Sequence, residues 1–179
     1  MQGCAYMANQ KRRKNSIRRP SWDYRSPGFY FVTICAYQRL HLFDNPTLYQ
    51  ILESTIQNLP VYKSCDHITL DRWVIMPNHI HLLIYVDETE EYQTIPFSTK
   101  NLMARSVGAI VATLKGRVTR EIRQHEGSIQ VWQRGYWDRI VRDEEELNRI
   151  REYIRLNPER WAEDHENLDR LLERKDFHQ

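Results

Sequence analysis

The chain has 179 residues, enough for one domain with a core of its own, and its 26 basic and 24 acidic residues give a net charge of only +2. Net charge therefore makes no case for a nucleic-acid partner, and three widely spaced cysteines without a Cys-x-x-Cys pair argue against a disulfide framework or a cysteine zinc site. Because no apolar stretch approaches membrane-spanning length and the first residues lack a secretory signal, we expect a cytoplasmic protein with no membrane partner.

Positive charge is concentrated near the start of the chain. Residues 1–27 are polar and end at a Ser-Pro-Gly breaker, so we interpret them as a basic N-terminal arm. Such an arm suits a partner that carries phosphates, and an indole within it could stack on an unpaired base. A solvated, charge-rich terminus is the alternative interpretation. The candidate DNA contacts are Arg12, Arg13, Lys14, Arg18, Arg19 and Trp22.

The first regular elements predicted are a strand and a helix. Residues 29–37 are apolar on both faces, which is typical of a central strand. Asn45 and Pro46 then offer a helix cap and a proline at the first helical position, and apolar residues recur at helical spacing until Pro60. We therefore expect a helix over residues 46–59 with one buried stripe.

Two apolar runs joined by a Pro-Asn turn, residues 67–76 and 79–86, predict a pair of neighbouring strands. The second run begins with His79, Ile80 and His81. Because side chains alternate along a strand, both imidazoles lie on one face and Ile80 lies on the other. This pair can bind a cation, although a histidine on a strand is also commonly a hydrogen-bonded core or surface residue.

A surface loop over residues 87–98 precedes the second predicted helix. Residues 99–124 carry an apolar stripe that suits packing on a sheet, and their basic side chains lie outside it. Residues 129–133 alternate like a fourth strand, which continues loosely to residue 141. Arg134 lies in this stretch and is a further candidate DNA contact, with a packing role as the alternative.

The third predicted helix carries the candidate nucleophile. Asp143 caps it, and Glu146 is the expected capping-box partner. Tyr153 and Asn157 are four residues apart, so they are neighbours on one side of the helix, at the edge of its apolar stripe. Asn157 and the proline after it end the helix. Residues 159–179 form a charged C-terminal tail with enough apolar residues for a weak helix.

The predicted order of elements is strand, helix, strand, strand, helix, strand, helix. The first six elements match the split β-α-β layout of a ferredoxin-like α+β fold, which has a four-stranded antiparallel sheet with two helices on one face. The extra C-terminal helix, which carries Tyr153, is then available to cover the other face. If both histidines point to that face, they meet this helix.

The chemistry of these side chains points to phosphodiester cleavage. Two imidazole nitrogens and the amide oxygen of Asn157 would leave open positions on a divalent ion for a substrate phosphate. The ion can polarise the phosphate, and Tyr153 can supply an oxygen nucleophile. On spacing alone, a core-edge tyrosine and a helix-terminating asparagine remain the simpler interpretations.

Three stretches carry a resemblance to a known family. They are Val74-Ile-Met-Pro-Asn-His79-Ile-His81-Leu-Leu-Ile, then Val131-Trp-Gln-Arg-Gly-Tyr-Trp-Asp, and finally Arg149-Ile-Arg-Glu-Tyr153-Ile-Arg-Leu-Asn157-Pro-Glu-Arg-Trp161. In this order, they resemble the REP-associated tyrosine transposases, which belong to the His-hydrophobe-His (HUH) single-strand transposases and endonucleases. The similarity covers roughly residues 18–167.

The resemblance implies a catalytic domain over residues 28–158, in which His79, His81 and Asn157 hold Mg²⁺ or Mn²⁺ and Tyr153 is the nucleophile. It implies that single-stranded or hairpin DNA of the REP type is cut and rejoined through a 5′-phosphotyrosine intermediate, in a bacterial, nucleoid-associated protein. A monomer is favoured over a homodimer. A hydrolytic metal-dependent nuclease and a non-catalytic DNA-binding protein acting on repeats are the alternatives.

Overall fold

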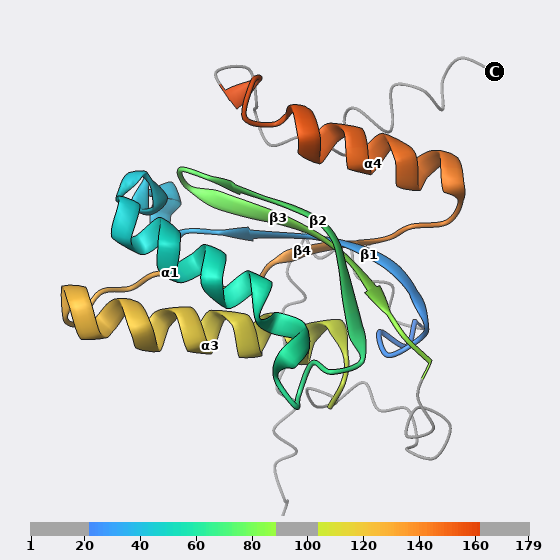
Figure 1. Ribbon diagram of the computed structural model, residues 1–179, viewed down its shortest axis with the longest axis horizontal. Helices are drawn as coiled ribbons and strands as arrows, with labels where there is room; N and C mark the ends of the chain where they lie inside the picture. Colours follow the sequence, from blue (N-terminus) through green and yellow to red (C-terminus); the bar gives the residue numbers. More distant parts are fainter. Residues whose placement is uncertain (1–21, 89–103, 162–179) are drawn as a thin grey trace, which may run out of the picture.

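The computed structural model describes residues 22–88 and 104–161. In these residues a four-stranded sheet carries two helices on one face and a third helix on the other (Figure 1). The strands are β1 (Gly28–Cys35), β2 (Ile68–Met76), β3 (His79–Val86) and β4 (Trp137–Ile140). The helices are α1 (Pro46–Gln57), α3 (Val107–Glu126) and α4 (Glu144–Leu156), and short 3-10 turns cover Tyr37–Arg39, Leu42–Asp44 and Leu59–Val61.

The sheet has the strand order β2-β3-β1-β4, and every neighbouring pair is antiparallel. This order confirms the predicted ferredoxin-like layout, with β1 in the interior of the sheet and an extra helix, α4, after the fourth strand. Residues that pair directly across strands share a face of the sheet. The register therefore aligns one row of side chains across all four strands: Val74, His81, Thr33 and Trp137.

The main core lies between the sheet and the helices α1 and α3. Alternate residues of the central strands, including Ile34, Ile80 and Leu82, are almost completely buried there against the apolar stripes of both helices. The side chain of Asn45 caps α1 by accepting hydrogen bonds from two backbone amides, and Pro46 begins the helix as predicted.

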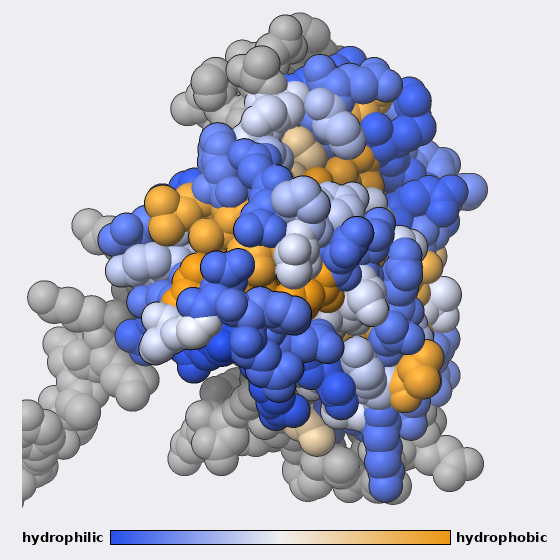
Figure 2. Space-filling model, turned by 60° about the vertical axis from the view of Figure 1, so that its left-hand side comes forward, coloured by the Kyte–Doolittle hydropathy of each residue, from blue (hydrophilic) through white to orange (hydrophobic). Residues whose placement is uncertain are grey.

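A smaller core holds α4 on the opposite face. Phe31 and Leu83 from the sheet pack with three residues of the helix, Leu147, Ile150 and Ile154. Each such side chain contributes about 1.5–3 kcal/mol when it is fully buried, so this contact alone favours docking of α4. The face of the molecule shown in Figure 2 is mainly hydrophilic, with hydrophobic side chains gathered in a few patches.

The predicted start of the second helix was wrong. Helix α3 begins at Val107 rather than residue 99, because Ser106 caps it by accepting a hydrogen bond from the amide of Ala109. Arg105, just before the cap, has a left-handed φ of 61°, which is incompatible with a continuous helix. Residues 99–103 lie outside the described part of the chain.

The predicted fourth strand was placed too early. Trp132 makes only an isolated bridge to Ala36, and the continuous strand begins at Trp137. Gly135 separates the two segments with a φ of 84°, a left-handed turn that interrupts pairing. The first strand also ends earlier than expected, at Cys35, because the chain turns into a 3-10 helix at Tyr37.

Residues 1–21, 89–103 and 162–179 are not described. The predicted basic arm, apart from residues 22–27, and most of the C-terminal tail therefore lie outside the described residues. None of the helices in the described ranges is long and apolar enough to cross a membrane.

Candidate active site

Two histidines of β3 form the centre of the candidate site. His79 and His81 are 0% and 2% exposed, and they lie on the face of the sheet that α4 covers. Their Nε2 atoms are 3.0 Å apart. Two imidazole nitrogens at this distance need a proton or a cation between them, since two lone pairs in contact repel each other.

The outer nitrogen of each imidazole has its own partner. The Nδ1 atom of His79 is 2.7 Å from Oδ1 of Asn78, and Nδ1 of His81 is 2.8 Å from Oγ1 of Thr33. Because an amide oxygen only accepts, Nδ1 of His79 is the donor in this bond, so a neutral His79 carries its lone pair on Nε2. A hydrogen bond of this kind orients metal-binding histidines in proteins.

Tyr153, on α4, contacts His81 from the helix that covers this face of the sheet. Its hydroxyl is 3.2 Å from Nε2 of His81. The tyrosine ring packs against the imidazole of His81, with 5.2 Å between centroids, and edge-on against Phe31, at 6.1 Å. Phe31 in turn stacks on His81 at 5.1 Å. The phenol is thus held against His81 of the same chain.

Asn157, at the C-cap of α4, is 2% exposed. Among the described residues, neither its Oδ1 nor its Nδ2 atom has a hydrogen-bond partner. A buried polar group without a partner costs about 1–3 kcal/mol, so this amide is suited to a ligand that supplies the missing contact. It lies one helical turn after Tyr153, as the sequence predicted.

The donor set available here is small. In residues 22–88 and 104–161, no three side chains of histidine, cysteine, aspartate or glutamate lie together so that they could hold a metal ion. Two imidazoles supplemented by the buried amide of Asn157 nevertheless fit a divalent ion that keeps several positions for water or phosphate. The facing Nε2 atoms and the unpartnered amide are the observations that fit such an ion.

The charge state of His81 favours binding of a cation. Burial holds the pKa of His81 well below its ordinary value, and the charges of His79 and Arg39 lower it further. The imidazole is therefore neutral at pH 7, with a lone pair available. Arg39 was not among the residues predicted from the sequence; it follows β1 in a turn where both Gln38 and Arg39 have left-handed φ angles of 50° and 59°.

Ion pairs fix the position of α4 over the sheet. The guanidinium of Arg151 donates to both carboxylate oxygens of Asp71, at 2.9 and 2.5 Å. Asp71 is the bulged residue of β2, where the register shifts between its two neighbours.

At the start of the helix, Asp143 accepts from the amide of Glu146, as predicted. The carboxylate of Glu146 instead accepts from the backbone of Arg142 and the side chain of Arg139.

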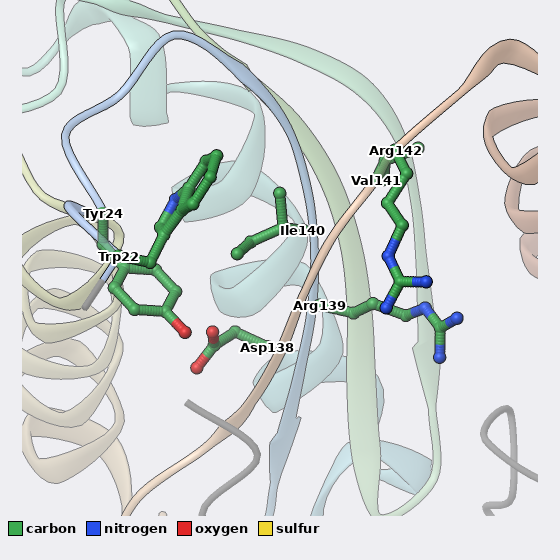
Figure 3. Close-up of a pocket in the computed structure, with 7 residues that line it drawn as sticks. All are labelled: Trp22, Tyr24, Asp138, Arg139, Ile140, Val141 and Arg142. Carbon is green, nitrogen blue, oxygen red and sulfur yellow. The ribbon is translucent and has the colours of Figure 1, made fainter. Parts of the chain in front are cut away.

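The two candidate DNA contacts within the described residues, Trp22 and Arg134, do not join this cluster. Residues 12, 13, 14, 18 and 19 lie outside the described part of the chain. The indole of Trp22 donates to the hydroxyl of Tyr30, whose ring belongs to the main core on the other face of the sheet. Trp22 lines a pocket of about 320 Å³ with Tyr24, Asp138 and other residues of β4 (Figure 3). Arg134 is exposed in the turn before β4.

Sequence reasoning missed the residues that position the histidines. Thr33 is the only hydroxyl on the α4 side of β1, and a polar residue within an otherwise apolar strand is the signal that could have identified it. Trp161 ends the last of the three stretches that resemble the known family, and its ring lies 5.8 Å from that of His79 and 5.8 Å from that of His41. The contact between residues 41 and 161 has no signal in local sequence.

Comparison with known proteins gives consistent matches. The family described as "Transposase IS200 like" matches residues 28–157. An uncharacterized protein of Haemophilus influenzae is 31% identical over 171 residues, which cover 87% of this chain and 94% of that protein. A second Haemophilus influenzae protein, provisionally named a REP-associated tyrosine transposase, is 25% identical over 148 residues, covering 76% of this chain and 73% of that protein.

One solved structure shares the fold. It is a REP-associated tyrosine transposase bound to a REP hairpin, with a TM-score of 0.57 and 21% identity. The similarity covers 76% of this chain and 70% of that one. At this level of identity the likeness supports the architecture and carries no residue roles.

Proposed function

This chain belongs to the IS200-like transposase family, and we propose that it cuts and rejoins single-stranded or hairpin DNA of the REP type through a 5′-phosphotyrosine intermediate on Tyr153. Membership of the family implies DNA binding and cleavage. The observation that carries the finer proposal is the 3.2 Å separation between the Tyr153 hydroxyl and Nε2 of His81.

The proposed reaction exchanges one phosphodiester for another. The phenolic oxygen of Tyr153 attacks the scissile phosphorus and loses its proton to water, while the bond from phosphorus to the 3′ oxygen breaks and the leaving 3′ oxygen takes up a proton from water. The products are a free 3′-OH and a 5′-phosphate esterified to the tyrosine. Because the ester retains a phosphodiester bond, a 3′-OH can attack it to rejoin DNA without ATP.

His79, His81 and Asn157 are the residues that would hold Mg²⁺ or Mn²⁺. A bound ion would polarise the phosphate and neutralise the charge that develops on it. Three features support this assignment: the neutral imidazole of His81, the facing Nε2 atoms, and the buried amide of Asn157. Thr33 and Asn78 orient the two imidazoles so that their Nε2 atoms point to a common place.

Hairpin or single-stranded DNA is the proposed substrate, and a monomer is the proposed functional unit. The monomer is supported by the contact between Tyr153 and His81, which needs no second chain. The proposed DNA partner is supported by the family and by the basic residues 12–19 of the arm. The REP hairpin itself is the ligand of the related protein of similar fold.

The test is a covalent adduct. A labelled REP-type hairpin with a single-stranded extension is incubated with protein and Mn²⁺, then denatured and separated by gel electrophoresis. We expect a labelled protein band with wild type and with the control Tyr49→Phe, and none with Tyr153→Phe or with a chelator. Tyr49 is a suitable control because it is exposed on α1, on the other face of the sheet.

Other outcomes would replace the proposal. An undiminished adduct with Tyr153→Phe would assign the nucleophile elsewhere. Cleavage that survives Tyr153→Phe without an adduct would indicate a hydrolytic nuclease. Salt-dependent binding of the hairpin, with neither cleavage nor need for metal, would indicate a non-catalytic DNA-binding protein.

A further inference from the structure

An exposed tryptophan ends the row of side chains that contains the candidate site. Trp137 pairs with Thr33, and Thr33 pairs with His81, so all three point to the same face of the sheet. Neighbouring strands are about 4.8 Å apart, which places Trp137 about 10 Å from His81 along this row. β4 is an edge strand of the sheet, so Trp137 is the last side chain of this row.

Trp137 is the large hydrophobic side chain of the sheet that is exposed to solvent in the described residues. It is 39% exposed, and the other large hydrophobic side chains exposed in the described residues, Leu40, Tyr49 and Val61, lie outside the sheet. The alternation of β4 agrees with this orientation: Asp138 and Ile140 point toward Trp22, whereas the side chain of Arg139 extends to the other side of the strand (Figure 3). Trp137 and Arg139 therefore share the face covered by α4.

The turn before Trp137 is held in place from the opposite layer. The ammonium of Lys115 on α3 donates to the carbonyl oxygens of Gln133, at 2.9 Å, and Gly135, at 2.5 Å. Burial lowers the pKa of Lys115 to about 8, so the amine is still charged at pH 7. The indole of Trp132 donates back to the carbonyl oxygen of Lys115. The exposed indole thus belongs to the first residue of a strand that follows a turn with a fixed backbone, which lowers the entropy lost when a ligand stacks on it.

We propose that Trp137 is a stacking platform for an unpaired DNA base next to the scissile phosphate. The inference rests on the proposed function for its substrate class, single-stranded DNA. A phosphate at the histidines and a flat apolar surface about 10 Å away, in the same row, suit consecutive parts of one strand. Base stacking on an aromatic ring tolerates any sequence, so Trp137 contributes affinity and position rather than base identity.

The test measures binding without cleavage. All variants carry Tyr153→Phe, and binding of a REP-type hairpin with a single-stranded extension is followed by fluorescence anisotropy. We expect Trp137→Leu to weaken binding about 5- to 150-fold, the range for loss of one stacked base. Trp137→Phe should retain most of the affinity. The matched control is Tyr49→Leu, at 36% exposure on the other face, which should change affinity by less than about twofold.

A double-mutant cycle identifies the base. The nucleotides of the extension are replaced by abasic sites one at a time. At one position, the replacement should weaken binding to the protein with Trp137 as much as Trp137→Leu does, and should cause no further loss in the leucine variant. 2-Aminopurine at that position should be quenched on binding, whereas a blunt duplex of the same sequence should bind both variants equally.

Two results would overturn the inference. The first is a loss with Trp137→Leu no larger than with Tyr49→Leu; the second is an abasic penalty that persists unchanged in the leucine variant. Circular dichroism checks whether the Trp137→Leu variant is folded. If it is not, the 2-aminopurine measurement on the protein that retains Trp137 still tests the inference. An absence of quenching at every position of the extension would refute the stacking platform. Failure of the tyrosine adduct would refute the proposed function but leave this binding result standing.

Discussion

Thr33→Val tests whether the hydrogen bond behind His81 prepares the site for a metal ion. Valine has nearly the shape of threonine, so the change removes one hydroxyl and leaves the packing of β1 intact. In the protein, that hydroxyl lies 2.8 Å from Nδ1 of His81, which is 2% exposed. The variant therefore leaves a buried imidazole nitrogen without its partner.

Two magnitudes follow from this geometry. An unpaired buried polar group costs about 1–3 kcal/mol of folding free energy. Loss of the partner that orients a metal-binding histidine typically lowers metal affinity about 10- to 100-fold. We therefore expect the Mn²⁺ concentration for half-maximal formation of the tyrosine adduct to rise by this factor in Thr33→Val, with the maximal rate largely restored at saturating Mn²⁺.

The control is Thr55→Val, which removes a similarly buried hydroxyl from α1, where it donates to the carbonyl oxygen of Ile51. It should lower stability without changing the Mn²⁺ dependence. A Thr33→Val variant with the wild-type Mn²⁺ dependence, or one that excess Mn²⁺ does not rescue, would refute the role of Thr33 in orienting His81.

Ile150→Ala should destabilise the protein by about 2–5 kcal/mol in urea unfolding, because Ile150 is 0% exposed in the small core beneath α4; an unchanged midpoint would show that α4 is not docked as described. Asp71→Asn should slow adduct formation by weakening the contact with Arg151, and the same change in an Arg151→Met background should have no further effect on the rate. Burial lowers the pKa values of both His67 and His81, so below about pH 6.5 the unfolded chain binds protons that the folded chain excludes. The free energy of unfolding in urea should therefore fall as the pH is lowered from about 7.5 to about 5.5. A free energy of unfolding that does not change over this range would contradict this reasoning.

The sequence alone was sufficient to predict the order of the strands and helices and to predict that the two histidines share one face of their strand. Side-chain alternation is a local property of a strand, so His79 and His81 had to share a face wherever the strand lay. The apolar stripe of α4 likewise indicated that Tyr153 and Asn157 lie on one side of a helix. These patterns repeat over a few residues, and a few residues suffice to detect them.

Boundaries set by contacts between distant segments could not be predicted in this way. The fourth strand begins at Trp137 rather than at residue 129 because Lys115, on another helix, binds the carbonyl oxygens of the turn around Gly135. Helix α3 begins late because of a left-handed residue and a serine cap, whereas its apolar pattern extends further toward the N-terminus. A hydrophobic pattern shows which residues prefer burial, and it does not show where hydrogen bonding stops.

The order of the amino acids was enough to predict two histidines on one face of a strand, and a tyrosine and an asparagine on one side of a helix. The folded structure shows that the two elements meet at Tyr153 and His81: the small core beneath α4 and the ion pair from Arg151 to the bulged Asp71 set the position and rotation of α4. The rotation of a helix over a sheet depends on packing between residues far apart in the chain, so no local pattern predicts it. The same holds for the row from His81 through Thr33 to Trp137, which exists only once three strands are in register.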